Sequence, residues 1–522
     1  MDVFETSRPS ARRWVVAIAV MSSAVMELLD TSVVNVSLPH IAGSLSSTVD
    51  EATWVLTSYI VANAIILPIT GWLANYVGRK RLLMTVVTGF TVSSVLCGLA
   101  PSLGALIFFR VMQGITGGGL QPLSQAVMLE EFPVRERGKA MAFWGLGIVA
   151  APILGPTVGG FITDAYSWRW VFYINVPVGI TSLILIYLFV EDPPYIRRGA
   201  LHIDAIGLGM LAIGMGSLQI MFDKGQEEDW FASRFIIVLA VLAFVFLTSF
   251  VIRELYTKEP LVRFRLLRYR TFAAGVTLAW LLGFVMYGSL VLLPLFMQTL
   301  LGWTAQTAGF YTSPRGVGSA LTMPVVGYLL GRGWDGRKML AFGFILASWS
   351  FFGYSHMTLQ SGQMDIFWYQ FIQGMALSFV FVPLTTLAMA PIPRSETGYA
   401  TSLYSVMRNI GASAGVSFVT TWIARRSQVH QNVLVANTTV YNEQFREWQL
   451  QTSRMFAGRG VDPITAGREA VAAAYGTVQR QASLLSFNET FRLMAILFLL
   501  CTLLVLLMRQ PKHTRGDVPP MH

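Results

Sequence analysis

The sequence predicts an all-α integral membrane protein with fourteen transmembrane helices, arranged as two six-helix bundles with two further helices inserted between them. Three observations lead to this fold class: the composition, a series of apolar segments of similar length, and a weak internal repeat. Of the 522 residues, 54% are hydrophobic and only 13% are charged, and the mean hydropathy is +0.56. Soluble proteins carry about 25% charged residues, so this composition argues against a soluble fold.

Apolar segments of about 20 residues recur along the whole chain, and each is long enough to cross a hydrocarbon core roughly 30 Å thick. We interpret them as fourteen membrane spans. Their predicted ranges are 14–38, 53–75, 82–100, 105–128, 139–163, 169–190, 203–222, 234–254, 272–298, 306–330, 339–357, 365–389, 399–424 and 488–508.

Basic residues gather in alternate connections between these spans. They lie at 8–13, 79–81, 135–139, 197–198, 258–270, 332–338, 394 and 509–515. Because the cytoplasmic loops of membrane proteins are enriched in lysine and arginine, both termini are predicted to be cytoplasmic. This asymmetry explains the net charge of +10, so no nucleic-acid partner is needed to account for it.

Two pairs of segments repeat at an offset of about 260 residues. The fourth span contains the sequence RVMQG at residues 110–114, and the twelfth contains QFIQG at 370–374. The connections after the second and tenth spans, at 71–81 and 327–338, share glycines and a basic turn. Spans one to six and nine to fourteen therefore look like two related halves.

The repeat predicts three parts of the chain. They are an N-terminal six-helix bundle at 1–200, two inserted helices at 201–256, and a C-terminal six-helix bundle at 257–522 that includes a periplasmic loop at 425–487. Parallel halves around a central cavity are typical of transporters that bind substrate near the membrane midplane and open to alternate sides.

Two acidic residues, Glu27 and Asp30, lie near the middle of the first span, which is otherwise uncharged. A charged side chain at this depth is costly, and such residues usually serve the movement of ions or protons. The two acids are three residues apart and share one helical face. We therefore predict proton coupling at Asp30 and Glu27, with Arg110 of the fourth span approaching one of them when a proton leaves. The alternative is a structural acid that stays paired with Arg110.

Several segments carry motifs of a known family. The first span contains LDTSVVNVSLP at 29–39, the fourth contains Arg110 with Gln113 and Gly114, and the sixth begins with WRWVFYINVPVG at 168–179. In the fifth span, glycines and prolines recur at Gly147, Pro152, Gly155, Pro156, Gly159 and Gly160. Together with the loop at 71–81, these motifs resemble the major facilitator superfamily, specifically its 14-helix drug/proton antiporter branch. The chain is similar to the EmrB-type exporters of that branch.

The resemblance implies the major facilitator fold in a multi-pass protein of the bacterial inner (cytoplasmic) membrane. It implies that the first-helix acid, Asp30, is a proton and cation site, whereas Glu27 lies outside the family motif. It also implies that the exporter works with a periplasmic adaptor protein and an outer-membrane channel.

The fifth-span motif has two physical interpretations. Small residues recur every four positions from Gly147 to Gly159 and form a smooth stripe that lets another helix approach closely, and the two prolines bend the helix. In one interpretation the stripe serves tight packing alone. In the other, the bent helix seals the path between the halves, which disfavours leakage and suits exchange.

The loop after the second span departs from its family pattern at one position. The matching residues of this inner-gate loop are Gly71, Gly78, Arg79 and Lys80, whereas Asn75 stands where the family usually has an acid. An ion pair that would latch the inward gate is therefore replaced at best by a neutral hydrogen bond. The second copy of the loop retains an acid, Asp335.

Candidate substrate-binding residues are polar or aromatic side chains inside the predicted spans. They are Asn35, Gln113, Gln121, Tyr287, Gln298, Phe310, Gln373 and Arg408. The second half also carries the cation Arg315, and no acid appears inside spans nine to thirteen before Asp365. This imbalance suggests a cavity for anionic or neutral amphipathic compounds, unless each arginine pairs with a backbone carbonyl or reaches an interface.

The polar segment from Arg425 to Phe487 contains no long apolar run. Helices are predicted at 442–455 and 465–485, separated by two glycines and a proline. The segment is either a solvated hairpin or a docking site for a periplasmic adaptor.

Nothing in the sequence indicates an enzyme. No P-loop of the type Gly-x-x-x-x-Gly-Lys-Ser/Thr occurs, so a proton gradient is the predicted energy source and no cofactor is expected. Cys97 and Cys501 fall inside predicted spans without the spacing of metal ligands, and no metal site is expected.

We therefore predict a proton-coupled multidrug exporter that expels hydrophobic or amphipathic compounds from the cytoplasmic side in exchange for protons. A dedicated exporter of an endogenous metabolite, such as a siderophore or a fatty acid, would share every motif. A proton symporter for uptake would have no need of the fifth-span stripe. A non-transporting membrane scaffold would not need the buried charges.

Overall fold

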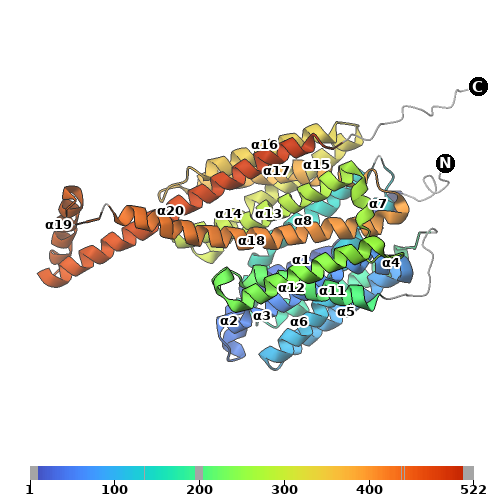
Figure 1. Cartoon of the computed structure of the whole chain (residues 1–522), viewed down its shortest axis with the longest axis horizontal. Helices are drawn as coiled ribbons and strands as arrows, with labels where there is room; N and C mark the ends of the chain where they lie inside the picture. Colours follow the sequence, from blue (N-terminus) through green and yellow to red (C-terminus); the bar gives the residue numbers. More distant parts are fainter. Residues whose placement is uncertain (1–9, 135, 194–203, 437, 440, 509–522) are drawn as a thin grey trace, which may run out of the picture.

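The structure is a computed structural model, and it describes residues 10–134, 136–193, 204–436, 438–439 and 441–508. Within these ranges the chain forms α-helices and short 3₁₀ helices and no strand, so the predicted all-α class is confirmed. Most of the helices run roughly parallel to one another along the long axis of the molecule (Figure 1).

The helices of the first half of the chain cover the predicted spans one to eight. They are α1 (Ser10–Ser44), α2 (Val49–Ala52), α3 (Trp54–Ile66), α4 (Thr70–Val77), α5 (Arg79–Leu99), α6 (Leu103–Gly117), α7 (Leu120–Glu131), α8 (Arg137–Ala165), α9 (Trp170–Tyr173), α10 (Asn175–Phe189), α11 (Ala205–Lys224) and α12 (Arg234–Tyr256). The 3₁₀ helices of this half are η2 (Leu67–Ile69), which joins α3 to α4, and η3 (Trp230–Ala232).

The helices of the second half cover the remaining spans and the polar segment. They are α13 (Arg270–Thr299), α14 (Ala305–Thr312), α15 (Pro314–Gly331), α16 (Gly336–Tyr354), α17 (Gln363–Met389), α18 (Thr397–Val435), α19 (Glu443–Ala457) and α20 (Pro463–Val505). The 3₁₀ helices η4 (Phe264–Arg268) and η5 (Arg394–Glu396) precede α13 and α18.

Helices occur at all fourteen places where the sequence predicts a membrane span. Eleven helical segments of the described chain are long and apolar enough to cross a membrane, and they coincide with predicted spans one to nine, twelve and fourteen. The predicted spans ten, eleven and thirteen are formed by α14 with α15, by α16 and by α18. These three do not meet the same criterion of length and hydropathy. They are assigned to the membrane because they pack against helices that do meet it.

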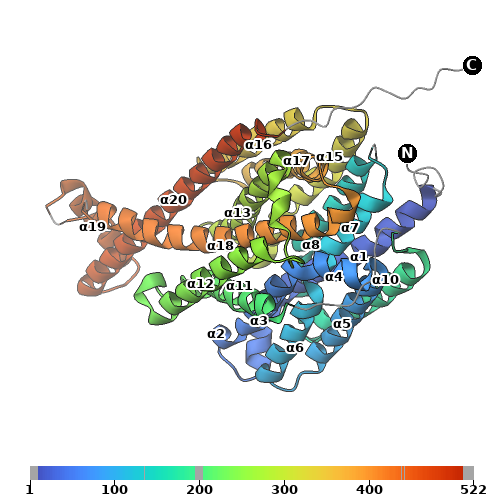
Figure 2. The same ribbon diagram turned by 45° about the vertical axis from the view of Figure 1, so that its right-hand side comes forward.

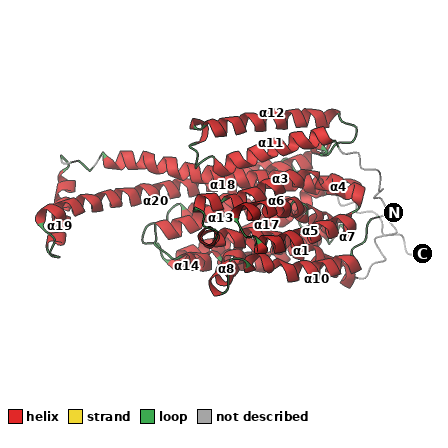
Figure 3. Cartoon of the chain, turned by 90° about the horizontal axis from the view of Figure 1, so that it is seen from below, coloured by secondary structure: helices red, strands yellow, loops and turns green. Residues whose placement is uncertain are grey.

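One end of the bundle collects the basic connections. The helix α1 begins and α20 ends there (Figures 2 and 3). Arg13 pairs with Glu136 at 3.6 Å, and Arg263 pairs with Glu396 at 3.0 Å. We call this end the basic end; the side of the membrane that it faces stays a prediction. Several of the basic residues used for that prediction lie outside the described residues: Arg8, Arg135, Arg197, Arg198, Arg509, Lys512 and Arg515.

The helices pack as two groups. In the N-terminal group (α1–α10), α1 packs on α8 and α10, and α6 on α3 and α5. In the C-terminal group (α13–α20), α13 packs on α18, α17 on α15 and α16, and α20 on α16 and α18. The groups meet where α8 contacts α15 and α17, and where α18 contacts α4 and α7. The domain boundaries stay predictions, and the one at residue 200 lies outside the described residues.

The inserted helices α11 and α12 form a pair at one side of the molecule. They pack on each other, and α11 also packs on α3 and on α18 (Figure 3). Within this pair, Arg253 of α12 forms a bidentate ion pair with Asp204, which precedes α11. Its Nε donates to Oδ2 at 2.7 Å and its Nη2 to Oδ1 at 2.9 Å. The pair therefore touches both groups.

The predicted loop at 425–487 is largely helical. The helix α18 continues to Val435, and α20 begins at Pro463 and runs without a break through the expected boundary at residue 488. Proline is favourable at the first position of a helix. Asp462 caps the helix, because its side chain accepts hydrogen bonds from the backbone N–H groups of Ile464 and Thr465. With α19, the two helices form an extension at the end opposite the basic end (Figure 1).

Glycines allow α13 and α18 to pack closely. A methyl group added at Gly283 would overlap the carbonyl oxygen of Arg408, and one added at Gly415 would overlap that of Phe284. Lipid tails are as apolar as the helix surfaces, so the hydrophobic effect does not drive helices together within the membrane. Close backbone contact supplies van der Waals packing, which holds the helices together instead.

Gly415→Ala is therefore expected to destabilise the protein by about 1–3 kcal/mol, because an added methyl group forces the two helices apart. The measurement is thermal unfolding of the purified protein in detergent. Gly476→Ala is the matched control, because nothing lies within 4 Å of an added methyl group at Gly476 on α20. There, alanine should leave stability unchanged or raise it by up to about 1 kcal/mol. Equal thermal midpoints for the two variants would contradict the close packing.

Candidate functional site

Asp30 occupies the middle of α1 and is completely buried. Its Oδ2 accepts a hydrogen bond from Nη1 of Arg110 at 2.5 Å, and the two side chains form an ion pair. Its Oδ1 accepts hydrogen bonds from the side-chain amides of Gln113 (3.0 Å) and Asn175 (2.7 Å). The carboxylate therefore joins α1 to α6 and to the first residue of α10.

Arg110 has several partners besides Asp30. It donates from Nε to the carbonyl oxygen of Val55 (3.1 Å) and from Nη1 to Oε1 of Gln113 (2.7 Å). Its Cζ lies 4.1 Å from the centroid of the Tyr59 ring, which is a cation–π contact. If Asp30 lost its negative charge, Arg110 would remain as a buried cation without a counter-charge, which is costly.

In this conformation, solvent does not reach Asp30. The exposed fraction of its side chain is 0%, as are those of Arg110 and Gln113. Asn175 also donates to Oγ of Ser94 (3.0 Å), so the network continues into α5. A role in proton coupling therefore requires a second conformation, in which water reaches the carboxylate.

Glu27 lies one turn before Asp30 and contacts different helices. Its Oε1 accepts a hydrogen bond from the side-chain amide of Asn63 on α3 (2.9 Å), and Gln121 of α7 lies beside its carboxylate. Gln121 in turn accepts a hydrogen bond from Nη2 of Arg408 on α18. A chain of polar side chains thus crosses from the N-terminal to the C-terminal group.

Sequence reasoning did not assign Asn63 and Asn175 to this site. A signal was available, because an amide side chain inside an apolar span is costly unless it has a partner. The partner could not be identified, since Asp30 and Asn175 are 145 residues apart. Only the packing of α1 against α10 brings them together.

The structure does not bring the eight candidate substrate-binding residues into one place. Gln113 belongs to the Asp30 network, and Gln121 and Arg408 belong to the chain that starts at Glu27. Gln373 lines a small cavity within the C-terminal group. The others are the half-buried Tyr287 and the exposed Asn35, Gln298 and Phe310, of which Phe310 has 68% of its surface exposed. Their role in binding stays a prediction.

The glycine stripe of α8 packs against α1. A methyl group added at Gly147 would lie 2.7 Å from Val25, and one added at Gly159 would lie 3.0 Å from Val33. Gly160 lies beside the stripe, with nothing within 4 Å of an added methyl group. The stripe thus serves packing inside the N-terminal group.

A serine of α1 compensates for a proline of α8. Pro156 has no N–H, so the carbonyl oxygen of Pro152, four residues earlier, lacks its usual helical donor. Ser32 donates a hydrogen bond to this oxygen (3.2 Å) and fits against Gly155, where an added methyl group would overlap it. The prolines and glycines of the motif therefore act together to fix α8 on α1.

A different face of α8 contacts the C-terminal group. A methyl group added at Gly138 would lie 3.0 Å from Leu330 of α15, and one added at Gly145 would lie 2.8 Å from Phe381 of α17. Trp144 stacks on Phe381, with ring centroids 5.8 Å apart. The stripe thus packs closely on α1, and neighbouring residues of the same helix make the contact between the groups. A role of the motif in sealing the path between the halves stays a prediction.

The inner-gate loop lies at the basic end, where the two groups meet. A methyl group added at Gly71 would overlap the backbone of Gly398 on α18. Gly78 has a φ of +96°, a conformation that favours glycine, and it separates α4 from α5. Lys80 donates its backbone N–H to Asp192 (2.8 Å).

The charges of this loop pair within their own group. Arg79 is 1% exposed and pairs with Glu130 of α7 at 2.6 Å. Asn75 is half-buried and makes no side-chain hydrogen bond to another described residue. In the second copy of the loop, burial raises the pKa of Asp335, but hydrogen bonds from Arg337 outweigh it and leave this pKa below its usual value. Neither Arg79 nor Asp335 forms its ion pair across the two groups.

Comparison with known proteins shows similarity over nearly the whole chain. Residues 20–416 match the Major Facilitator Superfamily. Multidrug export protein EmrB of Escherichia coli (strain K12) is 37% identical over 508 residues, which cover 96% of each chain. Fatty acid resistance protein FarB of Neisseria gonorrhoeae is 35% identical over 94% of this chain and 95% of its own. The crystal structure of the human organic anion transporter MFSD10 (TETRAN) matches 94% of this chain and 100% of its own, with a TM-score of 0.57 and 13% identity, a likeness of fold.

Arg110→Gln is expected to lower the free energy of unfolding by about 3–5 kcal/mol, because it leaves the Asp30 carboxylate buried without its cation. The double variant Asp30→Asn, Arg110→Gln should be more stable than Arg110→Gln alone, since no buried charge then lacks a partner. Thermal unfolding in detergent of the wild type, both single variants and the double variant measures this coupling. Arg332→Gln, at an exposed arginine of the basic end, is the control. Additive losses would contradict the pair as an interacting unit.

Proposed function

We propose that this chain, which belongs to the major facilitator superfamily and within it to the EmrB-type multidrug transporters, exports hydrophobic and amphipathic compounds from the cytoplasmic side of a bacterial inner membrane in exchange for protons. The family makes the chain a transporter rather than an enzyme. The multidrug substrate class rests on the similarity to EmrB. The observation that carries the proposed coupling is the Asp30–Arg110 pair, a titratable carboxylate inside the span α1.

This pair offers a physical link between proton binding and helix position. A proton on Asp30 removes its negative charge, so Arg110 loses its counter-charge, and the bonds that hold α1 to α6 and α10 weaken. Because α1 packs on α8, and α8 on α15 and α17, a shift of α1 reaches the surface between the two groups. In the proposed cycle, this shift favours access from one side of the membrane over the other.

Polar atoms on α7 and α18 support the existence of a second conformation. These helices pack against each other across the two groups. Side-chain atoms of Gln125 on α7, and of Ser402, Tyr404 and Ser405 on α18, are buried without a hydrogen-bond partner in the described structure. Buried polar groups are nearly always hydrogen-bonded, and these atoms would gain partners in a conformation that admits water to α7 and α18. Such an opening is what loading from the cytoplasmic side requires.

A proton gradient is the proposed energy source, and no cofactor is proposed. The sequence lacks the P-loop that ATP binding of that type requires. Glu27 is the second proposed proton-coupling residue, because the chain through Gln121 to Arg408 links its carboxylate to the C-terminal group.

Asp30→Asn is expected to abolish proton-driven efflux while leaving membrane insertion intact, because asparagine keeps hydrogen-bonding atoms but cannot titrate. The measurement is flux of a fluorescent drug in proteoliposomes under an imposed pH gradient. Asp50→Asn, at an exposed acid, is the matched control and should transport like the wild type. Gradient-driven efflux that persists in Asp30→Asn would refute the assigned role. Drug and protons moving in the same direction would indicate uptake by symport, and no flux in the wild type would indicate a scaffold.

We also propose that the extension formed by α18, α19 and α20 docks a periplasmic adaptor that leads to an outer-membrane channel. The helix α19 has no buried residue. It exposes three large apolar side chains, Trp448 (38%), Leu450 (57%) and Met455 (50%). Exposed apolar patches on a protein surface mark interaction sites, and these side chains are the apolar surface that α19 offers to a partner.

The double variant Trp448→Ala, Leu450→Ala is expected to lose drug resistance in a pump-deficient bacterium that supplies the adaptor and channel, because large apolar anchors dominate such interfaces. Flux in proteoliposomes, where no adaptor is needed, should stay at the wild-type level. The control is Gln444→Ala, Glu447→Ala, at two exposed polar positions of the same helix. Docking through α19 is wrong if both double variants confer full resistance.

A dedicated exporter of an endogenous amphipathic metabolite is the second candidate. The similarity to FarB, which is named for fatty acid resistance, favours it. The same proteoliposome assay separates the two functions when decanoate and several unrelated drugs are compared. Transport of decanoate alone would support the dedicated exporter, and transport of the unrelated drugs would support the multidrug function.

A further inference from the structure

The C-terminal group contains a buried cation without a counter-charge. Arg315, in the first turn of α15, is 4% exposed. No hydrogen bond or ion pair joins its guanidinium to another described residue, and the ionisable groups that act on it are the tyrosines Tyr354 and Tyr287 rather than a carboxylate. A buried arginine in a membrane protein is costly unless an anion or several acceptors compensate it.

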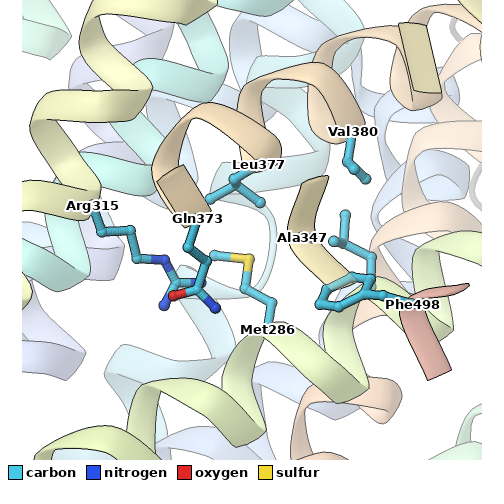
Figure 4. A pocket seen from close by; sticks show the side chains of 8 residues that line it. Met286, Arg315, Ala347, Gln373, Leu377, Val380 and Phe498 are labelled. Carbon is cyan, nitrogen blue, oxygen red and sulfur yellow. The ribbon is translucent and has the colours of Figure 1, made fainter. Parts of the chain in front are cut away.

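Arg315 points into a small cavity of about 10 Å³, which is room for about one water molecule. The cavity is also lined by Gln373 and by apolar side chains that include Met286, Leu377 and Phe498. Figure 4 shows the guanidinium of Arg315 beside the amide of Gln373, with the thioether of Met286 next to both. Met286 is the adaptable part of this lining, because methionine has several rotatable bonds.

A second polar group near Arg315 also lacks a partner. The hydroxyl of Tyr354 is buried and has no hydrogen-bond partner in the described structure. Arginine has only donors, and a tyrosine hydroxyl can donate as well. The guanidinium of Arg315 and the hydroxyl of Tyr354 therefore donate to no acceptor among the described residues.

The internal repeat shows what the corresponding place holds in the other half. Gln373 corresponds to Gln113 at the offset of about 260 residues. Gln113 and Arg110 both donate to the carboxylate of Asp30, which comes from the first helix of its group. The first helix of the C-terminal group, α13, contains no acidic residue. At the position that corresponds to Arg110 this half has Gln370, and its buried cation, Arg315, comes from α15 instead. The C-terminal half therefore has an arginine and an amide but no built-in anion.

We propose that the cavity at Arg315 and Gln373 binds one monoanionic group that comes from outside the chain, either the carboxylate of an amphipathic solute or a free inorganic anion. The guanidinium supplies the charge and the amide a second donor, as Arg110 and Gln113 do for Asp30. At about 10 Å³ the cavity must widen to admit a carboxylate or a bromide ion, and rotation of the Met286 side chain is the movement that would widen it. Binding at equilibrium does not require proton-coupled export, so the inference stands apart from the proposed function.

The test is thermal unfolding of the purified full-length protein in detergent, because a ligand that binds only the folded state raises the thermal midpoint. Sodium octanoate is compared with uncharged octanol, and sodium bromide with sodium gluconate at equal ionic strength. We expect octanoate or bromide to raise the midpoint of the wild type and octanol and gluconate to have little effect. In Arg315→Gln, the affinity for the effective anion should fall at least about tenfold. Arg332→Gln, an exposed arginine at the end of the same helix, is the matched control.

The two sources of the anion are separated by comparing the two salts. Stabilisation by octanoate and not by bromide identifies a carboxylate site, and stabilisation by bromide identifies a site that accepts an inorganic anion; either result supports the proposal. It is overturned if neither anion stabilises the wild type, or if the effect survives in Arg315→Gln.

A second variant covers the case in which Arg315→Gln does not fold. Gln373→Leu keeps the arginine and the volume of the side chain, and it is expected to fold and to bind the anion several-fold more weakly. Unchanged binding in both Gln373→Leu and a folded variant that lacks the charge, such as Arg315→Met, would overturn the site. Drug efflux by the same variants is a separate readout, so loss of anion binding in a protein that still exports drugs leaves the proposed function untouched.

Discussion

The ion pair between Asp30 and Arg110 is the constraint on which the rest of the N-terminal group depends. Two opposite charges at bilayer depth are tolerated only when other groups hydrogen-bond to their remaining donors and acceptors. Here the side chains of Gln113 and Asn175 donate to Asp30, and the carbonyl oxygen of Val55 accepts from Arg110. Polar bonds therefore hold α1 against its neighbours. In the proposed coupling, protonation of Asp30 leaves Arg110 without its counter-charge, and this links proton occupancy to helix position.

Apart from the hydrogen bond from Arg408 to Gln121, the contacts between the two groups are of another kind. At the basic end they are close approaches of backbone, as at Gly71 and Gly398, together with the stacking of Trp144 on Phe381 farther along α8. Several side-chain polar atoms of α7 and α18, which touch each other across the groups, are buried without partners in the described structure. Separating such surfaces in water costs less than breaking a fully satisfied buried network. Opening is therefore expected between the groups, and each group is expected to move largely as a unit.

The two halves treat buried charge differently, although they share a repeat. The N-terminal half supplies both members of its ion pair, whereas the C-terminal half supplies arginines at Arg315 and Arg408 without a carboxylate nearby in its own spans. Arg408 reaches a neutral amide of the other half, and Arg315 faces a cavity. In the two proposals, the N-terminal half holds the proton and the C-terminal half attracts a negatively charged group.

The sequence by itself determined the all-α membrane class, the family and the places of the fourteen helices, because the bilayer imposes apolar segments of fixed length that need no knowledge of their neighbours. It also singled out Asp30, Glu27 and Arg110 as costly charges. Only the tertiary structure decided their partners: Asn175 and Asn63, the packing of the α8 stripe on α1, and the unbroken course of α20. Contacts between helices that are far apart in the chain produce no recognisable pattern of residue spacing in the sequence. They arise only when the helices pack together.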